Sequence, residues 1–302
     1  MERTEISELG EFGLIQHLTR ELNHQQPSTL RGVGDDAAVI DTMGKRLVVS
    51  TDMLCEGVHF DLSYSPLKHL GYKAVVVNLS DICAMNAIPT QVVVALGLSN
   101  RFSVEAVDEL YEGIKLACEV YKTDLVGGDT TSSPSGLNLS VTAMGLADAD
   151  ALVGRDGSGD GDLLVVSGDL GAAYMGLQIL EREKTVYEAA PTAQPELADF
   201  AYLLERQLKP EARVDVVREM GDLGLKPTSM IDISDGLSSE IMHLGTASGV
   251  GFKVYEDKLP IDPKVYDTAR EFNLDPTLCM LSGGEDYELL FTVKQDDYEK
   301  VR

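Results

Sequence analysis

Short apolar runs alternate with longer segments of helical periodicity along the first half of the chain. In the segment 104–121, apolar side chains recur every three or four residues, which predicts a helix with one buried face. They are Val107, Leu110, Tyr111, Ile114 and Ala117. Short apolar runs predict strands at 47–50, 91–98 and 139–146, and helical periodicity predicts another helix at 67–85. Such alternation indicates an α/β or α+β domain.

A segment rich in aspartate, glycine and alanine, residues 147–162, interrupts this alternation. Its composition is typical of a linker or a long turn. A chain of 302 residues also exceeds what one ordinary hydrophobic core covers. We therefore place a boundary near Asp150, between domains at 1–150 and 151–302.

The second domain begins with its own strand and helix. The apolar run 163–166 predicts a strand, and 172–183 predicts a helix. The polar stretch 184–197 contains Pro191 and Pro195, which favours a mobile connection. The expected fold class is α+β, or two-domain α/β.

Composition is that of an ordinary globular protein, with 44% hydrophobic and 25% charged residues. We find no run of the roughly 18 apolar residues that a membrane-spanning helix needs, and the acidic, polar start differs from a signal peptide. The four cysteines have neither metal-binding nor disulfide spacing. We expect a cytoplasmic protein without membrane partners.

The charge balance is strongly acidic, with a net charge of −25 from 50 acidic and 25 basic residues. Such a surface repels nucleic acid and anionic membranes. An anionic ligand would therefore need metal ions as mediators. Arg155, just after the boundary, is the best single cationic candidate.

Aspartates gather where predicted strands end, so that their oxygens would project from the strand ends. The clusters are 48–52, 125–130, 230–236 and 281–286, with a fifth at 32–38. Carboxylate and hydroxyl oxygens without His or Cys are the ligands that Mg²⁺ prefers. Adjacent glycines let backbone N–H groups approach a phosphate closely. The pattern predicts a magnesium-phosphate site.

Each cluster also has a structural interpretation when it is taken singly. Asp36 and Asp129 suit turns, and Asp52 suits the end of a strand. Ser234 or Asp235 suits the N-cap of the next predicted helix. Five clusters in one chain favour the metal site over five separate coincidences.

Two further residues and one absent motif complete the candidate chemistry. Asp81 lies inside an apolar, helical run, where a buried carboxylate needs a partner. His59 follows Asp52 by seven residues and is either structural or a donor to a phosphate. Gly44-Lys45-Arg46 lacks the other residues of a P-loop.

In order and spacing, these segments resemble those of thiamine-monophosphate kinases. The matching segments are 34–38, 50–52 with 57–60, 77–85, 127–131, 231–237 and 282–289. The resemblance implies the aminoimidazole-ribonucleotide-synthetase-like fold, in which a mixed-sheet, ATP-binding N-terminal domain dimerises and precedes an α/β domain.

The resemblance also implies a reaction and a set of site residues. ATP and thiamine monophosphate would give ADP and thiamine diphosphate in a homodimer, by direct transfer assisted by several Mg²⁺ ions. The implied magnesium ligands are Asp36, Ser50, Thr51, Asp52, Asp81, Asp129, Asp232 and Asp235. The implied ATP contacts are Gly128, Asp129, Arg155 and Ser234. The implied contacts to the thiamine substrate are His59 and Glu285.

We expect no catalytic residue beyond the metal ligands, of which Asp52, Asp81 and Asp129 are the most critical. Family chains continue past the position of Arg302 and supply an aromatic contact to thiamine, which we expect to lie outside this sequence. Two other functions fit the pattern. One is another ATP-dependent member of the superfamily, of the ring-forming synthetase type. The other is a non-enzymatic, acidic protein that binds divalent ions.

Overall fold

The computed structural model describes residues 6–31, 39–192, 195 and 197–301, which form two compact units. The first unit comprises Met1–Ile82 and Ile88–Ala149, and the second comprises Cys83–Ala87 and Asp150–Arg302. In the described part of the chain, we find no helix that is both long and apolar enough to cross a lipid bilayer.

The first unit is built on a four-stranded mixed sheet in the order β3-β6-β4-β5. Strand β4 pairs in parallel with β5, and the other two pairs are antiparallel. The elements are α1 (Ile6–Thr19), β1 (Thr29–Arg31), β2 (Val39–Ile40), β3 (Arg46–Cys55), α2 (Leu67–Ala84), β4 (Ile88–Leu98), α3 (Val104–Tyr121), β5 (Asp124–Ser132) and β6 (Leu137–Ala147). β3 and β5 are therefore the two edges of this sheet.

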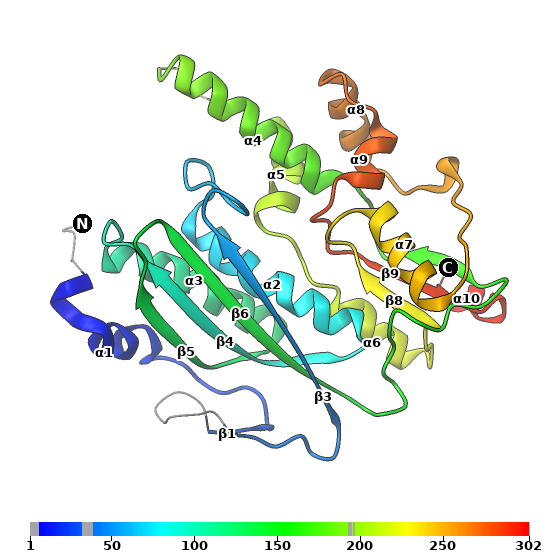
Figure 1. The fold of residues 1–302 in the computed structure, drawn as a ribbon, viewed down its shortest axis with the longest axis horizontal. Helices are drawn as coiled ribbons and strands as arrows, with labels where there is room; N and C mark the ends of the chain where they lie inside the picture. Colours follow the sequence, from blue (N-terminus) through cyan, green and yellow to red (C-terminus); the bar gives the residue numbers. More distant parts are fainter. Residues whose placement is uncertain (1–5, 32–38, 193–194, 196, 302) are drawn as a thin grey trace. The chain divides into compact units, whose positions relative to one another are not determined.

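Helices α2 and α3 cover one face of the sheet (Figure 1). Side chains alternate between the faces of a strand, and Val92 and Val94 of β4 are fully buried on the helix side. The two helices meet at glycines: a Cβ on Gly113 would lie 1.8 Å from the Lys68 carbonyl oxygen, and one on Gly71 would lie 2.0 Å from that of Leu110. Only glycine allows this approach.

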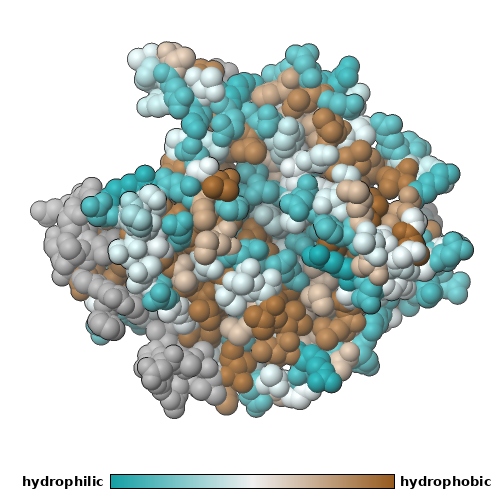
Figure 2. All heavy atoms as spheres, viewed as in Figure 1, coloured by the Kyte–Doolittle hydropathy of each residue, from teal (hydrophilic) through white to brown (hydrophobic). Residues whose placement is uncertain are grey.

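The other face of the sheet carries exposed apolar side chains. On β3, Leu47, Val49 and Met53 are 43%, 55% and 57% exposed. Figure 2 shows apolar side chains gathered over the strands of this sheet. We refer to Leu47, Val49 and Met53 as the open-face apolar patch. Exposed apolar side chains that gather on one face of a sheet are typical of an interaction surface.

The second unit is built on a three-stranded antiparallel sheet in the order β7-β9-β8. Its main elements are β7 (Leu163–Val166), α4 (Ala172–Ala189), α5 (Ala201–Leu208), α6 (Val214–Asp222), β8 (Ser229–Asp232), α7 (Leu237–Ser248), α8 (Pro263–Glu271), α9 (Pro276–Ser282), β9 (Leu289–Val293) and α10 (Tyr298–Val301). Short 3-10 turns occur at Ala198–Phe200, Glu256–Lys258 and Gln295–Asp297. A cluster of buried apolar residues that includes Ile231, Leu244 and Leu290 joins the sheet to α7.

Three local expectations were wrong. Residues 184–189, expected in a mobile connection, extend α4 to Ala189. The polar clusters around Asp52 and Asp129 lie within β3 and β5 rather than beyond their ends. Each is an edge strand with a ladder partner on one side only, so polar residues there keep access to water. The residues before the fourth cluster end helix α9 and not a strand.

Candidate active site

Strand β3 and helix α2 bring Ser50, Asp52 and Asp81 to the same side of the sheet. The Ser50 hydroxyl donates to Asp81 Oδ2 at 2.5 Å, and the Asp52 N–H donates to Asn78 Oδ1 at 2.8 Å. Residues two apart on a strand share a face, and residues three apart on a helix share a side. The spacing along the strand therefore matches the spacing along the helix, and the contacts Ser50–Asp81 and Asp52–Asn78 lie side by side. The partner that a carboxylate inside α2 requires is thus Ser50.

Thr51 lies on the other face of the sheet. It stands opposite Thr142 in the ladder with β6, and directly opposed residues point to the same face. Its hydroxyl donates to the Val141 carbonyl at 3.0 Å and accepts from Thr142 Oγ1 at 3.0 Å. Its side-chain oxygen therefore points away from the side of Ser50 and Asp52.

The turn that follows β3 fixes His59. The N–H of Cys55 donates to His59 Nδ1 at 3.0 Å. A nitrogen that accepts a hydrogen bond carries no proton, so the neutral ring carries its proton on Nε2. His59 is exposed. Partial burial raises the pKa of Asp52, and a positive charge on His59, when its ring is protonated, would act in the opposite direction.

Asp129 lies on the opposite edge of the sheet from Asp52. The rows of the ladder run from Met53 through Ser140 and Ala95 to Asp129. Three strand spacings separate β3 from β5, which amounts to about 14 Å. The exposed Asp129 carboxylate therefore shares the face of the open-face apolar patch.

Gly128 has a structural reason to be glycine besides the expected approach to a phosphate. A Cβ at this position would lie 2.1 Å from the Val94 carbonyl oxygen of the neighbouring strand. A Cβ added to Gly127, in contrast, would have no other atom within 4 Å. Asp36, with its glycine-rich segment, lies outside the described residues.

In the second unit, Asp232, Ser234 and Asp235 follow one another from β8 into α7. Asp232 is buried, whereas Ser234 and Asp235 are exposed. Neither of the exposed residues caps α7, because its N-cap is Gly236. Instead, the buried Glu240 carboxylate accepts from the N–H groups of Ser234 at 3.2 Å and Asp235 at 2.8 Å. The N–H groups of Ser234 and Asp235 are thus occupied, so these two residues would contact a ligand through their side chains.

Arg155 is exposed, and its carbonyl accepts from the Ser248 hydroxyl at 3.2 Å. No group of three or more His, Cys, Asp or Glu side chains that would hold a metal occurs within the described residues. The expected ligands are spread over two units, over both edges of one sheet and over a segment outside the described ranges.

Three acids follow one another closely in the segment 285–288, and two of them are fully buried. The Asp286 carboxylate accepts from the Gly171 N–H at 2.8 Å and the Ala173 N–H at 3.4 Å, where α4 begins. Burial raises the pKa of Asp286 to about 6, although these N–H groups and Arg206 oppose the rise. Glu285 alone is partly exposed.

The third acid, Glu288, is held by two arginines that the sequence pattern did not reveal. Arg206 Nη2 lies 2.9 Å from Glu288 Oε1, and Arg213 Nε lies 2.6 Å from Oε2. The Ser167 hydroxyl donates to Oε2 at 2.6 Å. Burial alone would raise the pKa of Glu288, but the hydrogen bonds and charge of Arg213, with those of Arg206 and Ser167, bring it below its usual value.

Gln207 contacts the first acid of this segment, Glu285. Its Nε2 donates to Glu285 Oε2 at 2.8 Å. It lies four residues after Leu203 on the buried side of α5. A polar residue at an apolar position of the helical period is the signal by which the sequence pattern could have revealed it.

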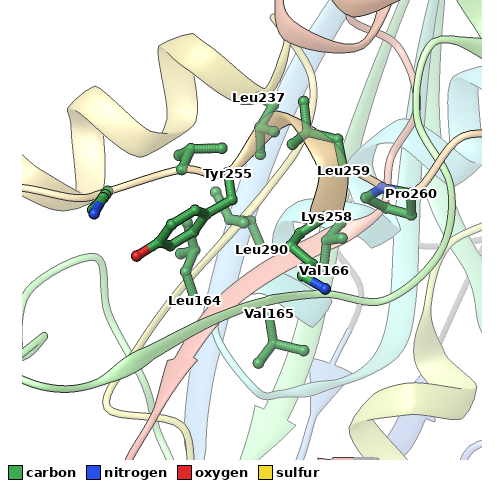
Figure 3. Close-up of a pocket in the computed structure, with 11 residues that line it drawn as sticks. Leu164, Val165, Val166, Leu237, Tyr255, Lys258, Leu259, Pro260 and Leu290 are labelled. Atoms are coloured by element: carbon green, nitrogen blue, oxygen red, sulfur yellow. The ribbon is translucent and has the colours of Figure 1, made fainter.

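A small pocket of about 140 Å³ also lies in this unit, lined mainly by apolar side chains. In Figure 3, the segment with Tyr255 and Leu259 passes over Leu164, Val166 and Leu290. None of the expected site residues lines it. We regard it as a surface hollow beside β7 rather than the place of the chemistry.

The chain is similar to known proteins over nearly its whole length. Residues 34–147 match the family "AIR synthase related protein, N-terminal domain". A thiamine-monophosphate kinase from Aquifex aeolicus (strain VF5) is 38% identical over 287 residues, which are 95% of this chain and 87% of that protein.

Two solved structures are similar to this chain as well. Thiamine-monophosphate kinase from Stenotrophomonas maltophilia K279a matches with a TM-score of 0.79 and 34% identity, over 94% of this chain and 85% of that chain. The structure of AaThiL complexed with AMPPCP and TMP matches with a TM-score of 0.75 and 34% identity, over 98% of this chain and 89% of that chain. The expected fold is confirmed.

Proposed function

The chain belongs to the thiamine-monophosphate kinase family of ATP-dependent phosphotransferases, and we propose that it transfers the γ-phosphoryl group of ATP to thiamine monophosphate. The products are ADP and thiamine diphosphate. The observation that carries this proposal is a similarity that covers 95% of the chain in sequence and 98% in structure, and therefore extends over both units.

The donor chemistry of the first unit fits magnesium. Ser50, Asp52 and Asp81 offer only oxygen atoms, and the 2.5 Å contact between Ser50 and Asp81 shows that two of these donors already converge. The residues that would hold the ions are Ser50, Asp52 and Asp81 on one side of the sheet, Thr51 and Asp129 on its other face, and Asp36, Asp232 and Asp235 in other segments. When bound, several Mg²⁺ ions offset the charge of the two anionic substrates.

The protein's own contribution is alignment. The second pKa of a phosphate monoester lies near 6, so the acceptor is largely dianionic at neutral pH and needs no general base. Gly128, Asp129, Arg155 and Ser234 hold ATP in this proposal. The proton on Nε2 suits His59 to donate to the acceptor phosphate, and Glu285 faces the thiamine. Fixing both reactants in line accounts for most of the catalysis in phosphoryl transfer.

The two sheet edges support a homodimer. Asp52 on β3 and Asp129 on β5 stand about 14 Å apart in one copy, too far to share one ion. A second copy that docks on the open-face apolar patch would cover the face that carries Asp129, and Asp52 would reach such an interface only from the β3 edge, because its side chain points to the other face. Each site would then use Asp52 of one subunit and Asp129 of the other.

ADP release by the purified protein tests the reaction. The assay contains Mg²⁺ and ATP and compares thiamine monophosphate, free thiamine and aminoimidazole precursors as acceptors. We expect turnover with thiamine monophosphate alone. Turnover with an aminoimidazole precursor would identify a ring-forming synthetase instead, and metal binding without any turnover would identify a non-enzymatic protein.

Replacing the magnesium ligand Asp52 tests the site itself. Asp52→Asn keeps the shape and removes the charge, so turnover should fall at least about a hundredfold, with an unchanged thermal midpoint. Asp160→Asn, at an exposed position in a turn, is the matched control and should keep full activity. Wild-type rates in Asp52→Asn would contradict the assignment.

A further inference from the structure

We propose that Gln207 is a positioning residue for the acceptor: its side-chain amide orients the Glu285 carboxylate toward the thiamine group. The inference rests on the proposed role of Glu285 in binding that substrate. The contact that carries it is the 2.8 Å hydrogen bond from Gln207 Nε2 to Glu285 Oε2. Gln207 itself is only 6% exposed.

The surrounding acids leave Glu285 as the ligand-facing group. Asp286 is 1% exposed and accepts from the start of α4, and Glu288 is 0% exposed between Arg206 and Arg213. Both arginines form ion pairs with Glu288, and Arg206 also donates to the Asp169 and Asp286 carbonyls. Gln207 is neutral, so it places no positive charge beside the Glu285 carboxylate. A carboxylate complements the cationic thiazolium ring of the acceptor.

The backbone at Glu285 is held without help from Gln207. Glu285 and Tyr287 have φ angles of 57° and 52°, in the left-handed region that residues other than glycine rarely adopt. Their N–H groups donate to the carbonyls of Ser234 at 2.7 Å and Ile233 at 2.9 Å. Arg206 Nη2 donates to the Asp286 carbonyl at 3.2 Å.

Three contacts therefore fix the main chain, and the Gln207 contact acts on the carboxylate rotamer. A side chain that sets a rotamer affects the ligand more than the fold, because it supplies the ordered geometry that binding would otherwise have to impose. This distinction separates a positioning role from a structural one.

The first test is Gln207→Met, which keeps the length of the side chain and removes the amide donor. We expect the KM for thiamine monophosphate to rise about tenfold, the equivalent of one hydrogen bond to a charged group. The KM for ATP and kcat should change less than about twofold. Glu205→Gln, exposed on the same helix, is the matched control and should change none of these values.

A double-mutant cycle with Glu285→Gln decides whether Gln207 acts through Glu285. If it does, adding Gln207→Met to Glu285→Gln leaves the KM for thiamine monophosphate where Glu285→Gln alone puts it. The inference would be overturned if the KM of the double variant rose by the product of the two single effects. It would also be overturned if Gln207→Met lowered kcat and left KM unchanged. If Gln207→Met does not fold, Gln207→Glu keeps the shape and should weaken binding through repulsion between two carboxylates; unchanged binding would overturn the inference.

Failure of the inference and failure of the proposed function are distinguishable. An active wild type with an unaltered Gln207→Met variant overturns the inference alone. A wild type that neither turns over nor binds thiamine monophosphate in calorimetry overturns both. A wild type that binds but does not turn over overturns the proposed reaction, and the binding constants of the same variants then test the inference.

Discussion

Asp286 and Glu288 lie two residues apart, are equally buried, and have pKa values shifted in opposite directions. The difference lies in their partners. Glu288 contacts two guanidinium groups directly, whereas the nearest guanidinium nitrogen of Arg206 is 4.0 Å from Asp286 Oδ1. N–H groups at the start of α4 therefore carry most of the compensation for Asp286. The cost of burying a carboxylate depends on which atoms replace its water.

This difference predicts how stability depends on pH. The pKa of Asp286 rises from 3.8 in the unfolded chain to about 6 in the fold. Between these values the unfolded chain has released its proton and the fold has not, so the free energy of unfolding falls as pH rises. Relative to Asp286→Asn, the wild type should lose on the order of 2 kcal/mol between pH 4 and 6.5 in urea titrations. Parallel pH profiles would contradict the shift.

At the scale of elements, the pairing of α2 with α3 depends on two glycines. Gly113 approaches the Lys68 carbonyl and Gly71 that of Leu110. The same α2 carries Asn78 and Asp81, which contact β3. The glycines therefore determine how closely α2 is held, and with it the position of two groups of the site.

Gly113→Ala should disrupt this pairing. A Cβ 1.8 Å from a carbonyl oxygen forces the helices apart, and we expect a loss of about 3 kcal/mol in the free energy of unfolding. Gly221→Ala is the control, because nothing lies within 4 Å of its Cβ on α6. That change should stabilise the protein by about 0.5 kcal/mol. Similar urea midpoints for the two variants would refute the argument.

Periodicity predicted these helices closely. The expected helix at 67–85 is Leu67–Ala84, and that at 104–121 is Val104–Tyr121. Strand ends were predicted less well, because Asp52 and Asp129 are tolerated inside edge strands. Arg206 and Gln207 were missed because their partners lie 82 and 78 residues away. A local pattern shows which side of a helix is buried but not which segment covers it.

At the scale of the whole molecule, the acidic segments fall in two units and on two edges of one sheet. This separation is why the sequence predicted the residue types better than their geometry. It also makes the proposed homodimer testable through its shared sites.

Mixing two inactive variants should restore activity. If Asp52 and Asp129 of different subunits share a site, a mixed dimer of Asp52→Asn and Asp129→Asn has one intact site and one with both changes. After random reassociation about half of the dimers are mixed, and each mixed dimer has one intact site of two. The mixture should therefore recover about a quarter of the wild-type rate. A mixture as inactive as its parents would place both residues in sites within one subunit.

Within residues 285–288, two acids are buried and one is partly exposed, and this difference has a consequence for evolution. Substitutions at Asp286 and Glu288 disturb buried contacts and are therefore removed by selection for stability. Glu285 directly precedes them on a backbone that other contacts hold, and of the three acids only its side chain is partly exposed. A descendant could acquire a different acceptor by changing Glu285 and Gln207 together while inheriting the rest of the fold unchanged.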